Sequence, residues 1–444
     1  MKSKKLLALL MALIVALAAV ACGGGEDTPG SDEPGTTQEP GNASSEDSLW
    51  NRTFEGVTLK RLLWYEPSER EQALVKEFEE KTGCTIVDEI VDYENYNTKI
   101  AASIAGGDPY DIGYIYGAFF PTQIIAGMYQ PIDKAYLSSE YMNDSTSSET
   151  LAKGGFDLEK MDFYKWNNNY YGFCSYWDVD MLVLYYRTDL FKEAGLKTPN
   201  EYVAEGNWNL DTFYELAYQL TNARAGIYGY SAGGENIRGY GEFVSAFGTQ
   251  IVTYDSNGVP SQNLGDPLVL DGLNFIQKLT TGSTSVINSE ASFRKGTAAM
   301  AVDGLYEAPK MMNDSNVPDV VKNNWDVAPI PLAASNQGGA YPTDWLKAIG
   351  VVNGSKNPEA VAAFALHMSQ DKGDNIWEDY FTEEQIERIT PYYSNINYSN
   401  YAYGTLGEDY VTMITRIVLG DDVSQLISEY KTSFKAQIDK IINE

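Results

Sequence analysis

The sequence predicts an α/β fold. Strand-like and helix-like segments alternate along the chain from Val57 onward, and a strand–helix–strand order favours parallel pairing with a right-handed crossover. The length of 444 residues is enough for two to three domain-sized cores. A hydrophobic share of 43% and a charged share of 21% are typical of a globular protein, so the chain can bury such cores.

The first part of this α/β region begins with a buried strand over residues 57–66. Ser68 then opens a helix, because Ser68 and Glu71 have the spacing of a capping box, and Gly83 supplies the stop. Residues 84–92 form the next expected strand, followed by a helix that ends at Ala105 and a strand through Tyr116. We expect the strand ends at Tyr65 and Tyr116 to meet at one edge of a parallel sheet.

A second α/β region follows. A strand-rich stretch leads to a short helix that we expect Asp189 to cap and Gly195 to stop. Asn257-Gly258 is a strong hairpin signal, and Asn357 followed by Pro358 predicts the start of another helix. The remaining expected elements are strands within residues 170–187, 292–308 and 323–333, and an amphipathic helix over 207–221.

The amino terminus has the features of a secretory signal. Three lysines in the first five residues precede an apolar stretch that ends at Ala21, which is short for a permanent membrane span. Ala19-Val20-Ala21-Cys22 resembles the lipobox of bacterial lipoproteins, which implies cleavage of residues 1–21 and lipidation of Cys22. Residues 22–48 are rich in Gly, Pro, Ser and acids, so we expect a disordered acidic tether behind the anchor.

The formal net charge of −30 constrains the partners. Removal of the three lysines in residues 1–21 brings it from −30 to −33. Such a surface repels nucleic acid and anionic substrates, so neutral or cationic partners are favoured. The single histidine, His367, excludes multi-histidine metal sites, and we expect neither a metal nor a cofactor. Cys84 and Cys174 are the other cysteines, and we favour two free thiols over a disulfide.

An ordered series of motifs then carries a resemblance to a family. GDPYDIGYIYG is followed by LYYRTDLFKEAGLKTP, NWNLDTFYELAYQL, FRKGTAAMAVDG, WDVAPIPL and SKNPEAVAAFALHM. From about Leu49 to Met368 this series resembles the family 1 extracellular solute-binding proteins, the sugar-binding components of ABC importers. The order of the motifs carries the likeness, above all FRKGTAAM followed by the WDVAPIP stretch.

The resemblance implies a two-lobed fold of the periplasmic-binding-protein type II, with mixed sheets flanked by helices and a hinge between the lobes. Mapped onto this chain, lobe I would comprise residues 49–174 and 346–395, and lobe II residues 175–345 and 396–444. We expect the chain to cross between lobes near Cys174–Met181 and near Trp345–Gly350. The ligand would lie between strand ends of both lobes.

Aromatic rings with polar tips suit the apolar face and hydroxyl rim of a sugar, and the chain has 32 Tyr and 8 Trp. Position selects the candidates: ends of expected strands, the two crossings, and the residues after the FRKGTAAM strand. The family places a ligand-binding acid at the first crossing and a stacking aromatic after this strand. The expected ligand-binding residues are Trp64, Tyr65, Glu66, Tyr114, Tyr116, Trp177, Asp178, Glu235, Asp303, Gly304, Tyr306, Asp344 and Trp345.

These features predict a bacterial, lipid-anchored, extracytoplasmic protein that captures a carbohydrate, favoured to be an oligosaccharide, and delivers it to ABC permease subunits. We expect a monomer that catalyses no reaction. A binding protein for polyamines or other cationic solutes and a surface glycoside hydrolase stay open as alternatives. Gly229-Tyr230-Ser231-Ala232-Gly233 matches the nucleophile elbow of hydrolases, but the histidine that this chemistry needs could only be His367, inside an apolar helical stretch.

Overall fold

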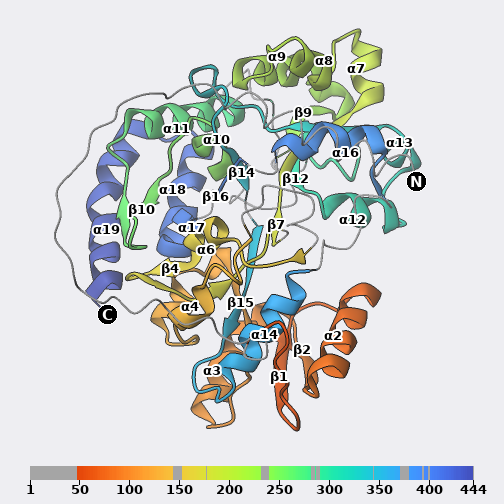
Figure 1. Ribbon diagram of the computed structural model, residues 1–444. Helices are drawn as coiled ribbons and strands as arrows, with labels where there is room; N and C mark the ends of the chain where they lie inside the picture. Colours follow the sequence, from red (N-terminus) through yellow and green to blue (C-terminus); the bar gives the residue numbers. More distant parts are fainter. Residues whose placement is uncertain are drawn as a thin grey trace, which may run out of the picture.

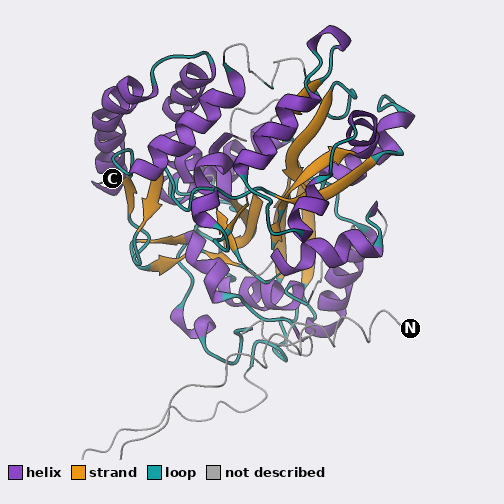
Figure 2. Ribbon diagram, turned by 90° about the horizontal axis from the view of Figure 1, so that it is seen from above, coloured by secondary structure: helices purple, strands orange, loops and turns teal. Residues whose placement is uncertain are grey.

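The computed structural model describes residues 48–143, 153–176, 178–231, 240–281, 286, 291–343, 345–370, 380–392, 395–398 and 401–443. Two mixed sheets form the centre of this part of the chain, and helices pack on their outer faces (Figures 1 and 2). Within these residues, no helix is both long enough and apolar enough to cross a membrane.

The first sheet has the strand order β2-β1-β3-β15-β6, with β7 paired to the end of β15. β1 runs parallel to β2 and β3, as the sequence predicts, whereas β15 runs antiparallel to β3. β15 reaches this sheet from the far end of the sequence. The strands are β1 (Thr58–Leu63), β2 (Thr85–Ile90), β3 (Ile112–Tyr116), β6 (Gly172–Phe173), β7 (Val179–Asp180) and β15 (Trp345–Val351).

The second sheet has the order β13-β8-β12-β9. β8 lies antiparallel to β12 and β13, and β12 lies parallel to β9. Both sheets are therefore mixed and flanked by helices, which confirms the predicted α/β class. The strands are β8 (Leu182–Arg187), β9 (Tyr228–Ser231), β12 (Ala298–Gly304) and β13 (Trp325–Pro329).

Helix boundaries follow the local signals, with three corrections. Ser68 caps α2 (Glu69–Thr82) by accepting from the Glu71 backbone N–H, but the Glu71 carboxylate bonds Arg61 instead of completing a capping box. Asp189 lies inside α7 (Thr188–Ala194) and pairs with Arg187 at its N-cap. Asn357 precedes α14 (Pro358–Met368) without a side-chain cap, because its amide donates to Asp111.

A helical layer lies beside the second sheet (Figure 1, left). α10 (Gly241–Ser245) packs on β9 through Phe243, whose ring centroid is 5.6 Å from that of Tyr230. α11 (Pro267–Thr280) packs on α10, and the last two of the three carboxyl-terminal helices pack on α11, with the first packed against them. These are α17 (Tyr401–Leu406), α18 (Glu408–Val418) and α19 (Val423–Asn443), with the predicted hairpin β10 (Val252–Tyr254) and β11 (Pro260–Gln262) beside them.

The chain changes sheets after α14. α14 packs against α2 and β15 of the first sheet, whereas α16 (Glu383–Ile389) packs against β13 of the second. Asp326 on β13 fixes α16 by accepting hydrogen bonds from Gln385 at 2.9 Å and from Arg388 at 2.6 Å. The exact division of the chain into lobes stays a prediction.

Shorter elements connect these layers. The helices among them are α3 (Tyr96–Ala105), α4 (Thr122–Ile125), α6 (Leu158–Met161), α8 (Pro199–Ala204), α9 (Leu210–Leu220), α12 (Glu307–Asn313) and α13 (Asp319–Lys322). The remaining strands are β4 (Lys165–Trp166), β5 (Asn169–Tyr170), β14 (Tyr341–Thr343) and β16 (Ile396–Tyr398). The 3-10 helices are η2 (Tyr93–Asn95), η3 (Gly117–Phe119), η4 (Lys134–Leu137), η5 (Asp162–Tyr164), η6 (Ala223–Ala225), η9 (Ala334–Asn336) and η10 (Thr390–Tyr392).

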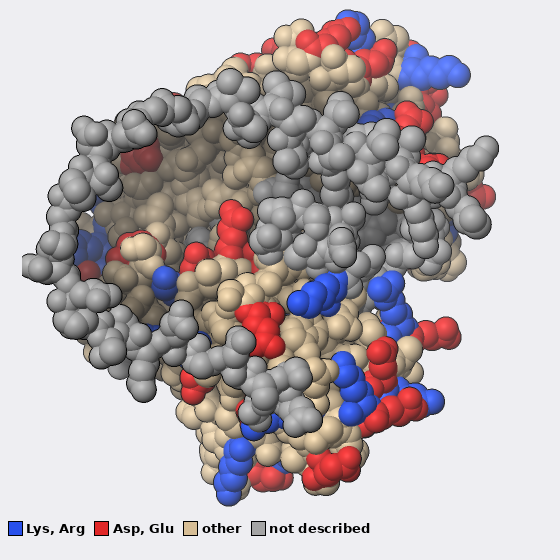
Figure 3. All heavy atoms as spheres, in the orientation of Figure 1, with Lys and Arg blue, Asp and Glu red and all other residues tan. Residues whose placement is uncertain are grey.

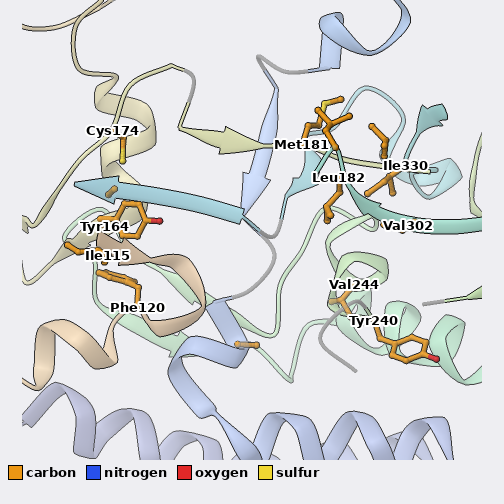
Figure 4. Close-up of a cluster of buried hydrophobic side chains, with 14 of the residues drawn as sticks. Ile115, Phe120, Tyr164, Cys174, Met181, Leu182, Tyr240, Val244, Val302 and Ile330 are labelled. Carbon is orange, nitrogen blue, oxygen red and sulfur yellow. The ribbon is translucent and has the colours of Figure 1, made fainter. Parts of the chain in front are cut away.

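Buried side chains around both sheets belong to one hydrophobic core. Figure 4 shows Ile115, Phe120, Tyr164 and Cys174 around the first sheet, and Met181, Leu182, Val302 and Ile330 around the second. Both described cysteines, Cys84 and Cys174, are buried and free, which confirms the expectation of two thiols. On the face seen in Figure 3, Lys and Arg lie interspersed with Asp and Glu over the lower half of the molecule.

Candidate functional site

Half-buried aromatic rings gather at the carboxyl edge of the first sheet. Trp64 follows β1 and Tyr116 ends β3, and because these strands are parallel, both residues reach the same edge. The centroid of the Trp64 ring lies 5.4 Å from that of Tyr116, at an interplanar angle of 72°. The sequence placed these two strand ends together, and the geometry brings their rings into contact.

Two further rings, which the sequence analysis did not select, complete this group. Tyr93 on η2 lies 5.8 Å from Tyr116 and stacks on Phe119 of η3 at 5.3 Å and 29°. All four rings are partly exposed. We call Trp64, Tyr93, Tyr116 and Phe119 the aromatic cluster. Tyr93 follows β2 just as Trp64 follows β1, so extending the strand-end argument to the second strand would have found it.

A charged network lies beside the aromatic cluster and is joined to it through Tyr65 and Tyr114. The fully buried guanidinium of Arg61 donates to both carboxylate oxygens of Asp88 at 2.7 Å and to Glu71 at 2.7 Å. Glu71 also accepts from the hydroxyl of Tyr65 at 3.2 Å, and that hydroxyl accepts from Lys347 Nζ on β15 at 3.0 Å. Burial first, and then the charge of Glu71, raise the pKa of Tyr65, so this hydroxyl stays protonated.

Tyr65 and Tyr114 differ from Trp64 and Tyr116 in their surroundings, because the Tyr65 hydroxyl is bonded within the charged network and Tyr114 is buried. Tyr114 is only 2% exposed, and its ring lies 5.6 Å from Trp64. It supports the cluster from inside the sheet, and Tyr65 joins the cluster to the charged network. Glu66 is exposed at the same strand end.

The first crossing contains a tight turn. The carboxylate of Asp178 accepts from the Ser175 backbone N–H at 2.6 Å, and its carbonyl accepts from the backbone of Lys347 at 3.3 Å. Asp178 thus shapes the link between β6 and β7 and ties it to β15. Trp345 begins β15 and pairs with Asp180 through the backbone. Trp177, Glu235 and Asp344, like Cys22, lie outside the described residues.

The remaining candidates lie at the end of β12 in the second sheet. Asp303 accepts from the backbone N–H of Gly304 at 2.9 Å. Burial, and secondly the charge of Glu307, raise the pKa of Asp303 to about 6. Tyr306 precedes α12, and Lys310 Nζ lies 4.3 Å from the centroid of its ring. The candidates that lie within the described residues thus fall at both sheets, with Asp178 and Trp345 beside the first and Asp303, Gly304 and Tyr306 at the second.

The geometry does not support the nucleophile-elbow interpretation of Ser231. Ser231 ends β9, and its hydroxyl donates to the carbonyl of Ala291 at 3.0 Å. His367 lies on α14 at the first sheet, buried, with Nε2 3.1 Å from the carbonyl of Leu74. The serine and the histidine therefore belong to different layers. Among the described residues, no group of three or more His, Cys, Asp and Glu could hold a metal ion.

Comparison with known proteins agrees with this architecture. The family described as "Bacterial extracellular solute-binding protein" matches residues 66–374. An erythritol/L-threitol-binding protein of Mycolicibacterium smegmatis is 25% identical over 330 residues, which cover 70% of this chain and 66% of that relative.

Solved structures share the fold at low sequence identity. The sugar-binding protein MalE of Xanthomonas citri has a TM-score of 0.66 at 15% identity, covering 86% of this chain and 98% of that one. An ABC substrate-binding protein of Listeria monocytogenes in complex with cycloalternan has a TM-score of 0.63 at 17% identity, with coverages of 86% and 99%.

A third structure is the galacto-N-biose-/lacto-N-biose I-binding protein of Bifidobacterium longum in complex with lacto-N-biose. Its TM-score is 0.64 at 16% identity, and the match covers 88% of this chain and 99% of that one. These likenesses confirm the predicted solute-binding-protein fold, and the family comprises binding proteins rather than enzymes. The chain belongs to the bacterial extracellular solute-binding protein family.

Proposed function

We propose that this protein captures a neutral carbohydrate outside the cytoplasm and delivers it to the permease subunits of an ABC importer. The aromatic cluster is the observation that carries the proposal. Its four rings are partly exposed at the carboxyl ends of parallel strands, where α/β proteins bind ligands. Aromatic faces stack on the C–H face of a sugar while the phenol and indole tips reach its hydroxyl groups.

The names of similar proteins support a polyhydroxylated ligand. They include a binding protein for erythritol and L-threitol and structures in complex with cycloalternan and lacto-N-biose. The four rings form one compact group, and Tyr93 and Phe119 add partly exposed apolar surface to that of Trp64 and Tyr116. We therefore favour an oligosaccharide.

Capture would proceed by hinge closure. The aromatic cluster and Glu66 would bind from the first sheet, and Asp303, Gly304 and Tyr306 from the second. Closure is driven by a higher ligand affinity of the closed state. The crossing residues Trp177, Asp178, Asp344 and Trp345, with Glu235, complete our proposed site, and Tyr65 and Tyr114 support it.

Lipidation of Cys22 would hold the protein at the membrane behind the tether of residues 22–48, as a monomer. Replacing Cys22→Ser in cells tests the anchor. The wild-type protein is expected in the membrane fraction, and the variant is expected in the medium or the soluble extract. Wild type and variant in the same fraction would contradict lipid anchoring at this cysteine and would leave the ligand proposal untouched.

Thermal-shift measurements on the full-length protein in detergent test the ligand. The panel is maltose, lacto-N-biose, erythritol, D-mannitol and spermidine, each with analysis for released products. A ligand at about 100 times its Kd adds about 2.7 kcal/mol to the free energy of unfolding, so a true ligand raises Tm clearly. We expect the largest shift from an oligosaccharide, without products.

Two other outcomes would overturn this proposal. A shift from spermidine alone would indicate a binding protein for cationic solutes, which the net charge of −30 also suits. Release of reducing sugar would indicate a glycoside hydrolase.

A further inference from the structure

The loop that carries half of the aromatic cluster is held from behind by a buried amide. Gln123 on α4 is 1% exposed. Its Oε1 accepts from the backbone N–H of Tyr116 at 3.2 Å, and its Nε2 donates to Asn97 Oδ1 at 2.8 Å and to the carbonyl of Tyr114 at 3.4 Å. This side chain therefore ties the end of β3 to α3 and α4, because an unmade buried hydrogen bond is costly.

α17 holds the same loop from the other side. Gly404 of α17 is buried against η3 so closely that a Cβ atom there would lie 2.0 Å from the carbonyl oxygen of Phe120 and 3.2 Å from that of Gly117. The hydroxyl of Thr122 donates to the carbonyl of Gly404 at 3.1 Å. Only glycine allows this approach of helix and loop backbones.

α17 belongs to the helical layer of the second sheet. It packs against α18 and α19, which pack on α11, and α11 packs on α10. The hairpin of that layer adds a contact, because Tyr254 bonds Thr405 through their hydroxyls at 2.8 Å and its ring lies 5.8 Å from Phe120. Phe120 packs on Tyr164 beside the first sheet (Figure 4). Through Tyr254, the helical layer of the second sheet therefore reaches the loop that follows β3.

We propose that α17 acts as a brace that positions Tyr116 and Phe119 for ligand, with Gly404 and Gln123 as its positioning residues. This inference rests on the proposed function for its consequence on binding. The aromatic cluster would thus be set jointly by both halves of the molecule, and hinge closure would have to pivot about the contact of α17 with η3. By linkage, ligand bound to the cluster would also strengthen the docking of α17.

Hydrogen exchange measured by mass spectrometry on the full-length, ligand-free protein tests the brace. The variant is Gly404→Ala, and the matched control is Gly272→Ala on α11. Gly272 is equally buried in the same helical layer, with a Cβ position 2.7 Å from Val244 Cα, but it faces α10 rather than η3. We expect the amides of residues 116–120 to exchange at least about tenfold faster in Gly404→Ala and at the wild-type rate in Gly272→Ala.

Thr122→Ala is a milder second variant, which removes one hydrogen bond to α17 and keeps the inference testable where Gly404→Ala does not fold. It is expected to accelerate the same amides less. Unchanged exchange at residues 116–120 in the variants that fold, or equal acceleration in Gly272→Ala, would overturn the brace.

Affinity gives an independent measurement. With whichever of maltose and lacto-N-biose shifts Tm, Gly404→Ala is expected to weaken binding about fivefold or more per folded molecule, and Gly272→Ala is not. Equal affinities of the two variants would overturn the positioning role. Hydrogen exchange is measured without ligand, so it tests the brace independently of the proposed function. Failure to bind any saccharide would contradict the proposed function but would not affect the exchange result.

Discussion

The two candidate surfaces differ in kind. At the first sheet, four rings pack on one another above a buried charged network centred on Arg61. At the second sheet, the ring of Tyr306 lies among the charged groups Asp303 and Lys310. The first surface offers apolar ring faces, and the second offers hydrogen-bonding groups. A sugar needs both, so the difference suggests that the two halves divide the recognition of one ligand.

The largest difference is expected in stability. Arg61→Met leaves Asp88 and Glu71 without their buried partner and is expected to cost about 3 kcal/mol or more in the free energy of unfolding. Arg294→Met at the second surface leaves one carboxylate, that of the largely buried Glu307, without its partner, and is expected to cost less than Arg61→Met because the Arg294 side chain is itself 38% exposed. Urea unfolding measures both, and equal losses would contradict the idea of a specially supported first surface.

Local sequence signals predicted most of the fold because they act over a few residues. Ser68 and Gly83 bound α2, Asn257-Gly258 turns the hairpin, and parallel strand ends bring Trp64 to Tyr116. The sequence did not predict which side chains from other elements contact these residues. Glu71 leaves its capping role because Arg61, ten residues away in the chain, lies buried beside it.

The sequence could predict candidate-site residues only where they lie at the ends of predicted strands, as Trp64 and Tyr116 do. Phe119 lies in η3, and the residues on either side of η3 are held by long-range contacts. Gln123 bonds the backbone of Tyr116, and Thr122 bonds the carbonyl of Gly404, which lies 282 residues away in the chain. No local pattern encodes such a contact. Likewise, Tyr114 and Tyr116 share one face of β3, and the burial of the Tyr114 ring follows from the packing of Trp64 and Tyr65 against it.

Ligand affinity should separate the two surfaces next. Trp64→Ala removes a ring at the centre of the aromatic cluster and is expected to cost about 2 kcal/mol of binding, roughly thirtyfold in Kd. Tyr306→Ala is expected to cost less, because a single ring is lost among polar groups. Isothermal titration with the saccharide that shifts Tm measures both. Trp50→Ala, a half-buried ring beside Glu140 and Lys153, is the control and should bind normally.

Asp303 should reveal a trade between stability and binding. Its folded pKa of about 6 lies above its ordinary value of 3.8, so between these values the folded state binds more protons than the unfolded state. Its contribution to stability is therefore present below pH 3.8 and is lost as pH rises through 6. Asp303→Asn is expected to stabilise the ligand-free protein at pH 8 by on the order of 1–2 kcal/mol, and to weaken saccharide binding. A destabilised variant at pH 8 would contradict the burial of this charge.

The smallest effect, at the first sheet, should have the opposite sign. Burial lowers the pKa of His367 below its ordinary 6.5, with Glu77 opposing and Lys81 reinforcing the shift. The unfolded state then binds more protons just below pH 6.5, so stability falls as pH drops from 6.5 toward the folded pKa.

Asp303 and His367 therefore contribute opposite slopes to the dependence of stability on pH between pH 5 and 7. Relative to the wild type, His367→Gln should make stability fall more steeply as pH rises from 5 to 7, whereas Asp303→Asn should shift the slope over the same range toward rising stability. Urea unfolding of the wild type and both variants at pH 5, 6 and 7 measures the slopes. A variant whose slope matches the wild type would mean that the group it replaces is solvated in the folded protein.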